Sequence, residues 1–333
     1  MSEMLKMIRT LGDQLRWARD LDLPELPTGH ELLVGGMGGS GIAGDFGAAL
    51  TSTSQGRIAV HKGYAPLPGW AARVQPTVVA ISYSGNTEET LSMVTAASES
   101  SLPVVTITTG GRLAEMSAEK GWPSIDVPSG LQPRAAVGYL VGAMARLLAV
   151  SGILPDQRSA LGEAADLVDE AATEGSETWV SASALASALT GRISIIYGGG
   201  PISGTAAQRW KTQINENAKM PAWWSLLPEL DHNEVVSWET LPTVTRDLLG
   251  IVALTDRADH PRIRARLDHS SALTEFAVPW LAEIPAGGDS ELARLMSLTV
   301  FGDLMSWMLA VEAGVDPVPV ETIEKLKKLL VED

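Results

Sequence analysis

The sequence contains no cysteine among its 333 residues, and this absence excludes several kinds of chemistry. Disulfide bonds, thiolate nucleophiles and cysteine-ligated zinc all need a side chain that the chain does not have. The five histidines do not show the His-Glu-x-x-His spacing of a helical metal site. We therefore predict that the protein uses neither a metal nor a cofactor.

Positive charge is also scarce. The chain has 25 Lys and Arg residues against 40 Asp and Glu residues, so its formal net charge is −15. Nucleic-acid binding depends on neutralising phosphates with basic side chains, and we predict no nucleic-acid partner. An anionic ligand gains nothing from this overall field. It has to be held by local dipoles, hydroxyl groups and a few well-placed cations.

Membrane and export signals are missing as well. No apolar run approaches the length of a membrane-spanning helix. The N-terminal residues lack the basic-then-apolar pattern of a signal peptide. We therefore expect no membrane contact and a cytoplasmic location.

Short apolar runs alternate with amphipathic segments through the first half of the chain. This order is typical of a parallel sheet covered by helices on both faces. A leading helix is predicted over Glu3–Leu21, where apolar residues recur at helical spacing. The predicted strands are Leu32–Gly35, Arg57–His61, Thr77–Ser82, Val104–Thr108 and Ser124–Val127. The helices between them should begin near Ser40, Thr87, Gly111 and Arg134.

A turn dense in hydroxyl groups, Ser82-Tyr83-Ser84-Gly85-Asn86-Thr87, connects a buried strand to an acidic helix start. Such a turn directs free backbone N–H groups and hydroxyls at one place, and the helix dipole adds partial positive charge. An ordinary N-cap is the plainer interpretation, but a cap needs only one hydroxyl. This turn supplies three, from Ser82, Ser84 and Thr87. We therefore predict an anion site that suits a phosphate.

The second half of the chain opens as the first does. The strand Ile193–Tyr197 runs into the glycine-rich segment Gly198–Gly204, as Leu32–Val34 runs into Gly35–Gly41. A later strand, Leu248–Thr255, stands where the hydroxyl turn would recur, but no Ser and Gly residues of that kind follow it. We predict an α/β protein with two doubly wound parallel-sheet domains of similar topology, only the first of which keeps a full phosphate loop.

The predicted division is residues 1–153 and 154–333. Between the two series, Gln157–Thr190 is rich in alanine and charged on one face, which predicts two connecting helices. A last helix is predicted over Glu321–Val331, after a segment broken by two prolines.

The segment Gly36–Gly41 matches the G-x-G-x-x-G pattern of dinucleotide-binding proteins. That pattern also needs a carboxylate about 20 residues later, at the end of the second strand, to hold a ribose hydroxyl. Here the second strand ends in His61-Lys62, so a nicotinamide or flavin site is disfavoured. Gly38 and Gly39 instead let the backbone approach a ligand closely, and Ser40 adds a hydroxyl in the same crevice.

These motifs, with several later ones, resemble those of the bifunctional phosphoglucose/phosphomannose isomerases, members of the sugar isomerase (SIS) domain superfamily. The resemblance extends over nearly the whole chain. The matching segments are Gly35–Gly41, Ser82–Thr90, Pro133-Arg134, Asn215–Lys219, Pro228–Glu234 and Ile323–Lys327. The hydroxyl turn alone marks only the superfamily, whereas its combination with Glu216 and His232 is specific for the isomerases.

The resemblance implies an enzyme that interconverts glucose 6-phosphate or mannose 6-phosphate with fructose 6-phosphate. It implies that four hydroxyl side chains bind the sugar phosphate: Ser40, Ser82, Ser84 and Thr87. It also implies a homodimer in which a histidine, here His232, reaches into the neighbouring subunit's site.

The same resemblance assigns the chemical steps. Glu216 would carry a proton between C1 and C2 through a cis-enediolate, and Arg134 would stabilise the enediolate charge. His232 and Lys327 would assist ring opening. General chemistry agrees, because the reaction needs a base that returns the proton it takes and a fixed cation near the developing charge. It needs no metal and no redox group.

Each assignment has a plainer alternative that the sequence leaves open. A glutamate at the end of a helix, as Glu216 is predicted to be, is often solvated. His232 could cap a turn, and Arg134 could be a surface cation. Several lysines adjoin Lys327, so the register of this residue is open. At the level of function, the alternatives are a non-catalytic sugar-phosphate-binding SIS protein and an isomerase of another phosphosugar.

Overall fold

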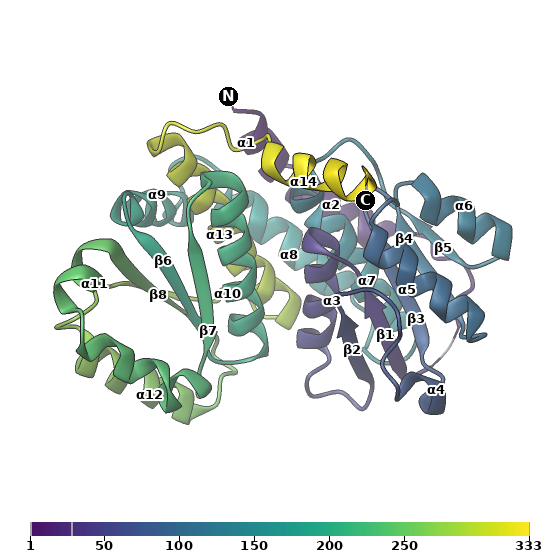
Figure 1. The fold of residues 1–333 in the computed structure, drawn as a ribbon, viewed down its shortest axis with the longest axis horizontal. Coiled ribbons are helices and arrows are strands. Elements are labelled where there is room, and N and C mark those ends of the chain that lie inside the picture. Colours follow the sequence, from purple (N-terminus) through teal and green to yellow (C-terminus); the bar gives the residue numbers. More distant parts are fainter. Residues whose placement is uncertain (1, 28, 333) are drawn as a thin grey trace.

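The structure, a computed structural model, describes residues 2–27 and 29–332 and contains two parallel sheets with helices between and around them (Figure 1). The N-terminal sheet has the order β2-β1-β3-β4-β5, and the C-terminal sheet has the order β7-β6-β8-β9. The N-terminal strands are β1 (Glu31–Gly35), β2 (Arg57–His61), β3 (Thr77–Ser82), β4 (Val104–Thr108) and β5 (Ser124–Asp126). The C-terminal strands are β6 (Ile193–Gly198), β7 (Ala222–Leu226), β8 (Leu249–Thr255) and β9 (Trp280–Pro285). The predicted fold class is confirmed.

The helices of the first half surround the N-terminal sheet. They are α1 (Glu3–Ile8), α2 (Leu11–Asp20), α3 (Gly38–Leu50), α4 (Ala71–Val74), α5 (Glu88–Glu99), α6 (Gly111–Lys120), the 3₁₀ turn η1 (Pro133–Ala135) and α7 (Val137–Val150). Two helices follow, α8 (Arg158–Ala171) and α9 (Glu177–Leu189), as predicted for the connecting segment. The predicted boundary at residues 153 and 154 falls between α7 and α8 and stays a prediction.

The second half adds helices around the C-terminal sheet. They are α10 (Pro201–Gln213), the π-helix η2 (Ile214–Ala218), the 3₁₀ turns η3 (Glu229–His232) and η4 (Glu234–Glu239), α11 (Pro242–Leu248), α12 (Pro261–Thr274), α13 (Glu291–Glu312) and α14 (Glu321–Glu332). Figure 1 shows α14, in yellow, lying over the N-terminal half of the molecule.

The strands predicted in the first half are confirmed to within one residue. The predicted leading helix is interrupted, because Thr10 turns its hydroxyl onto the carbonyl of Met7 at 2.7 Å and α2 starts afresh at Leu11. The helix expected from Arg134 is a 3₁₀ turn there, and α7 starts only at Val137. Strands β7 and β9, at the two edges of the C-terminal sheet, were not predicted.

The two halves share one hydrophobic core through their central helices. Trp210 of α10 is fully buried, and its ring stacks on Phe301 of α13 with centroids 5.3 Å apart. Its Nε1 donates to the carbonyl of Leu298 at 2.7 Å. Gly302 makes this approach possible, because a Cβ there would lie 2.4 Å from the indole. Helix α13 therefore docks directly on α10.

Among the described residues, one helix, α13, is long and apolar enough to cross a membrane by length and composition. The charged residues Arg294 and Asp303 interrupt this helix, so it is not an unbroken apolar run. Of that apolar stretch, 78% is buried inside the protein, so α13 serves as the central core helix.

A buried ion pair joins α10 to α13. Arg209 Nη2 donates to both carboxylate oxygens of Asp303, at 2.8 and 2.7 Å, and also to the carbonyl of Arg134 at 3.1 Å. Gln213 Nε2 adds a bond to Asp303 at 2.7 Å. Burial raises the pKa of Asp303, and the guanidinium of Arg209 opposes that shift. This network ties the packing of α10 and α13 to the turn that carries Arg134.

Replacing one partner of this pair should destabilise the protein strongly. Asp303→Leu leaves the Arg209 guanidinium buried without its counter-ion, which should cost about 3–5 kcal/mol of unfolding free energy in urea denaturation. The double variant Arg209→Leu/Asp303→Leu should recover most of this loss. A single variant within about 1 kcal/mol of the wild type would contradict the account.

Candidate active site

A cavity of about 270 Å³ opens at the carboxyl ends of β1 and β3, where the strand order of the N-terminal sheet changes direction. Open α/β sheets bind their ligands at such switch points. The wall is built from the segments that follow β1 and β3, from η1, from η2 and from α14. Eight of the predicted site residues line it: Gly38, Gly39, Ser40, Ser84, Thr87, Arg134, Glu216 and Lys327.

The hydroxyl turn leaves the first amides of α5 without a side-chain cap. Thr87 is the N-cap residue, but its side chain makes no capping hydrogen bond. Its hydroxyl lies instead 2.9 Å from the hydroxyl of Ser82. Ser82 is completely buried at the end of β3 and is not part of the cavity wall, so it supports Thr87 from behind. Helix amides that keep free donors and partial positive charge are well suited to a phosphate.

The N-terminus of α3 borders the same cavity. Its N-cap residue makes no side-chain capping bond, and Gly38 takes a left-handed conformation with φ of +53°. Ser40 Oγ accepts the backbone N–H of Tyr83 at 3.1 Å, which ties α3 to the hydroxyl turn. Gly39 admits η1, because a Cβ there would lie 2.7 Å from the carbonyl oxygen of Pro133. The glycines thus bring three elements together around one space.

Arg134, on η1, is 3% exposed, and its guanidinium is fixed from several sides. Nε donates to Oδ1 of Asn217 at 2.8 Å, and Nη2 donates to the carbonyls of Pro317 and Val318 at 2.6 and 2.9 Å. Nη1 lies 3.5 Å from Oε2 of Glu216. Burial lowers the pKa of Arg134, and the carboxylate of Glu216 opposes this shift. Arginine stays charged under such conditions, so the cavity wall carries a fixed cation.

Glu216 lies on the π-helix η2, which continues α10. Widened turns of this kind frequently mark functional sites. The Glu216 side chain is 26% exposed, so it is partly shielded by protein and still open to the cavity. Lys219 follows the π-helix with φ of +58°, and its ammonium donates to the carbonyl of Glu216. Burial, followed by the charge of Arg134, lowers the pKa of Lys219.

Lys327 and His232, the two residues that the resemblance assigns to ring opening, lie in different places. Lys327 lines the cavity from α14, whereas the neighbouring Lys325 and Lys328 do not. His232 lies at the end of η3, beyond β7, where it is exposed to solvent. It is not part of the cavity wall. A single chain therefore gathers the other catalytic candidates but leaves His232 apart from them.

Some residues around the cavity were missed by the sequence analysis. Glu89 and Gln132 line it. Gln14 supports it from below: this fully buried side chain donates to the carbonyl of Ala135 at 2.8 Å and accepts the N–H of Gly138 at 3.0 Å. It therefore holds η1 against α2. The available signal was a glutamine on the apolar face of the leading helix.

The placement of acidic side chains bears on metal and dinucleotide binding. Within residues 2–27 and 29–332, no group of three or more His, Asp or Glu side chains is placed to hold a metal ion. After β2, Lys62 forms an ion pair with Asp45 of α3. A cation thus stands near the strand end where a dinucleotide site would present a carboxylate to the ribose.

The chain resembles known proteins over nearly its whole length. Residues 180–330 match the family model described as the bacterial phospho-glucose isomerase C-terminal SIS domain. The chain is 37% identical to the bifunctional phosphoglucose/phosphomannose isomerase of Caldicellulosiruptor bescii, with 91% of this chain and 90% of that protein covered. The chain belongs to the bifunctional phosphoglucose/phosphomannose isomerase family. The member of this family from Aquifex aeolicus is 35% identical, with 99% of both chains covered.

One relative of this chain is named as an epimerase and not as an isomerase. The D-glucosamine-6-phosphate 4-epimerase of Sulfolobus acidocaldarius is 33% identical over 217 residues, which cover 64% of this chain and 66% of that protein.

Solved structures share the two-sheet fold at low sequence identity. The C-terminal domain of glucosamine-fructose-6-phosphate aminotransferase from Francisella tularensis superposes with a TM-score of 0.71 at 14% identity, covering 95% of this chain and 97% of that one. Tagatose-6-phosphate ketose/aldose isomerase from Escherichia coli gives a TM-score of 0.66 at 15% identity, covering 94% and 93%. These likenesses show the fold of this isomerase family member.

Removing the Thr87 hydroxyl should weaken phosphate binding. Thr87→Val deletes one donor beside the open end of α5, so the dissociation constant for inorganic phosphate should rise by about fivefold, equivalent to about 1 kcal/mol. Titration calorimetry measures this. Thr95→Val on the same helix is the matched control, because Thr95 is exposed and its hydroxyl donates to the carbonyl of Leu91 within the helix. Equal affinity of both variants would argue against an anion site here.

Proposed function

We propose that the protein is an aldose–ketose isomerase that interconverts glucose 6-phosphate and mannose 6-phosphate with fructose 6-phosphate. The observation that carries the proposal is the pair of Glu216 and Arg134, 3.5 Å apart, on the wall of a cavity that two helix N-termini without side-chain caps also border. The names of the relatives that match nearly the whole chain support the same activity.

The phosphate group would bind at the N-termini of α3 and α5. Backbone amides there supply donors, and the hydroxyls of Ser40, Ser84 and Thr87 surround them. Two helix dipoles that converge on one dianion offset the repulsion from a chain of net charge −15. Ser82 would contribute indirectly, through its hydrogen bond to Thr87.

The reacting carbons would then lie between the carboxylate of Glu216 and the guanidinium of Arg134. Glu216 removes the proton from C2 of the open-chain aldose, and the C–H electron pair forms the double bond of an enediolate. Nη1 of Arg134 stabilises the negative charge on oxygen, since Nε and Nη2 are already committed to protein acceptors. The carbonyl electron pair moves to O1, the hydroxyl proton of O2 passes to O1, and return of the carbon-bound proton to C1 then gives the ketose. Because C2 is planar in the enediolate, reprotonation at C2 leads to either the gluco or the manno sugar.

Ring opening would use His232 and Lys327. Lys327 already lines the cavity, but His232 is exposed to solvent at the end of η3 and does not line it. We therefore include in the proposal a homodimer in which each chain donates His232 to its neighbour, together with the cytoplasmic location expected from the sequence. Exposed apolar side chains gather in the elements after His232, which favours a protein interface there. They are Val236, Leu241, Val244 and Leu248.

Two other functions give different outcomes in the same assay. A non-catalytic sugar-phosphate-binding protein would bind fructose 6-phosphate without converting it. An enzyme of another phosphosugar is favoured by the epimerase relative, and it would turn over glucosamine 6-phosphate and leave fructose 6-phosphate unchanged. A coupled assay for conversion of each sugar phosphate, run beside a binding titration, separates the three.

Replacing the proposed base should remove turnover and spare binding. Glu216→Gln keeps the size of the side chain but cannot accept the proton, so kcat should fall by a factor of about 10²–10⁴. The affinity for inorganic phosphate should stay near the wild-type value. Glu174→Gln, at an exposed position on the connecting segment, is the control. A Glu216 variant with unchanged kcat, or with equal losses in kcat and phosphate affinity, would contradict this role.

Mixing two inactive variants tests the shared site. If Glu216 of one chain works with His232 of its partner, a heterodimer of Glu216→Gln and His232→Ala chains contains one intact site. An equal mixture, unfolded and refolded together, should recover about one quarter of wild-type activity, because half of the dimers are mixed. Mixtures as inactive as the separate variants would mean that both residues act within one chain.

A further inference from the structure

The C-terminal domain has a cavity of its own at the position that corresponds to the proposed phosphate site. It measures about 430 Å³ and lies at the carboxyl ends of β6 and β8, where the order of that sheet changes direction. Its wall includes Gly198 and Gly199 from the glycine-rich segment, and Asp256 and Asp259 from the segment after β8. The proposed isomerase chemistry uses none of these residues.

The loops of the two domains correspond position by position. Ser203 occupies the place in Gly198–Gly204 that Ser40 occupies in Gly35–Gly41. The segments that join strand to helix are also equal in length, Tyr83–Thr87 after β3 and 256–260 after β8. Tyr83 therefore corresponds to Asp256, since each directly follows its strand, and Asn86 corresponds to Asp259.

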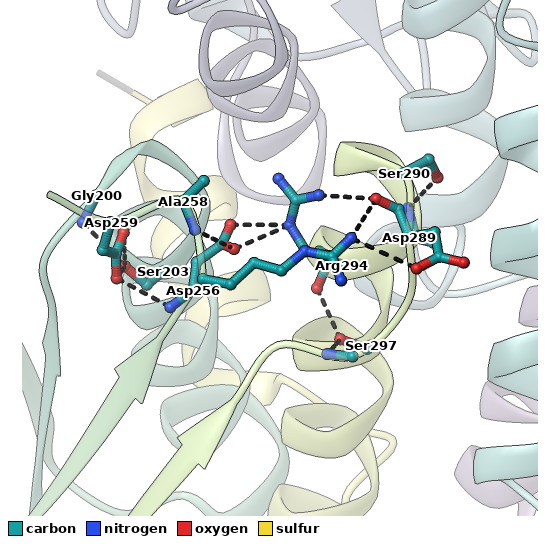
Figure 2. A network of polar contacts seen from close by, with 12 residues as sticks. Gly200, Ser203, Asp256, Ala258, Asp259, Asp289, Ser290, Arg294 and Ser297 are labelled. Carbon is teal, nitrogen blue, oxygen red and sulfur yellow. Dashed lines mark hydrogen bonds and ion pairs between the residues drawn. The ribbon is translucent and has the colours of Figure 1, made fainter. Parts of the chain in front are cut away.

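The hydrogen bonds at these equivalent positions differ in one respect. In the N-terminal domain the N–H of Tyr83 donates directly to Ser40 Oγ at 3.1 Å. In the C-terminal domain the N–H of Asp256 donates to Oδ2 of Asp259 at 2.9 Å, and Ser203 Oγ donates to the same carboxylate at 3.1 Å. Figure 2 shows the Asp259 carboxylate inserted between these two donors. An anion belonging to the chain thus stands between the two loops.

The surroundings are shaped for this carboxylate. A Cβ at Gly200 would lie 1.9 Å from Oδ1 of Asp259, whereas the corresponding position of the first domain is Met37. The N–H groups of Gly199 and Gly200 both donate to Ser203 Oγ, at 3.0 and 2.9 Å. That hydroxyl can therefore direct its own proton to Asp259. The amides of the glycine-rich segment thus act on the Asp259 carboxylate through the hydroxyl of Ser203.

The second aspartate of this segment, Asp256, is already neutralised. Arg294 Nε contacts both oxygens of Asp256, at 2.9 and 3.2 Å, and both side chains are buried (Figure 2). The N-cap residue of α12, His260, accepts the N–H of Arg262 through Nδ1 at 3.1 Å. Burial raises the pKa of Asp259, while the Asp256 amide and Ser203 oppose that shift. Asp259 is thus the negative group at the centre of the site.

We propose that the C-terminal domain retains a cradle for a tetrahedral oxyanion and that the carboxylate of Asp259 fills it. Each chain then binds a single phosphate ligand, in the N-terminal domain. Removing the Asp259 side chain uncovers a second site that accepts inorganic phosphate. The inference rests on the proposed function in one respect: the number of phosphates that the wild type binds. The proposed function places one phosphate in the N-terminal domain of each chain.

Equilibrium dialysis with radiolabelled inorganic phosphate tests this on the full-length protein. The wild type should bind one phosphate per chain, and Asp259→Ala should bind two. Asp259→Ser is a second variant that removes the carboxylate and so uncovers the site. It serves if the alanine variant is unstable, because the introduced serine hydroxyl can keep one hydrogen bond to Ser203. Asp259→Asn is the matched control, since it fills the space without charge and should bind one.

Each outcome has a separate meaning. Two phosphates bound by the wild type, or one bound by folded Asp259→Ala and Asp259→Ser proteins with native circular dichroism, would overturn the inference. No phosphate on the wild type with one on Asp259→Ala would support the inference and would count against the phosphate site of the proposed function. A second phosphate on Asp259→Asn would contradict the claim that the side chain blocks the cradle by filling it.

Discussion

The fixed guanidinium of Arg134 is the interaction on which the proposed active site depends. It joins η1 of the N-terminal half to the π-helix through Asn217, and to the segment before α14 through the carbonyls of Pro317 and Val318. Breaking this set of bonds would separate three walls of the cavity. The same contacts consume two of the guanidinium nitrogens, which leaves Nη1 beside Glu216. One buried side chain therefore organises the fold locally and is the cation that the proposed chemistry uses.

Both domains gather hydrogen-bond donors at the end of a strand, and they differ in the source of the negative charge that these donors need. A loop at the carboxyl end of a parallel strand gathers backbone and hydroxyl donors, and these donors need a negative partner. In the N-terminal domain the first amides of α3 and α5 have no side-chain cap, so a ligand can provide the charge. In the C-terminal domain Asp259 provides it internally. On this proposal, the acidic chain confines attraction for phosphate to one small region.

Sequence patterns predicted the elements that are buried on both faces, because such strands read as unbroken apolar runs. Strands β3 and β4 are fully buried and were located to the residue. Strands β7 and β9, which hold the polar residues Ser225 and Glu283 within their apolar segments, were not predicted, whereas the equally exposed edge strand β2 was. The hydroxyl turn was also predicted, but the burial of Ser82 behind Thr87 depends on how the strand end packs. Which of the lysines of α14 faces the cavity depends on how that helix is rotated about its axis. The local sequence does not determine this rotation, so Lys327 could not be singled out from its neighbours.

The position of a bound transition-state mimic tests the central claim most directly. In a crystal structure with 5-phosphoarabinonate, an enediolate mimic, the phosphate should contact the N-terminal amides of α3 and α5. The carboxylate of the mimic should lie within hydrogen-bond distance of Arg134 Nη1, with the Glu216 side chain over its first two carbons. A mimic bound away from these helix ends, or a Glu216 carboxylate turned from the ligand, would contradict the account.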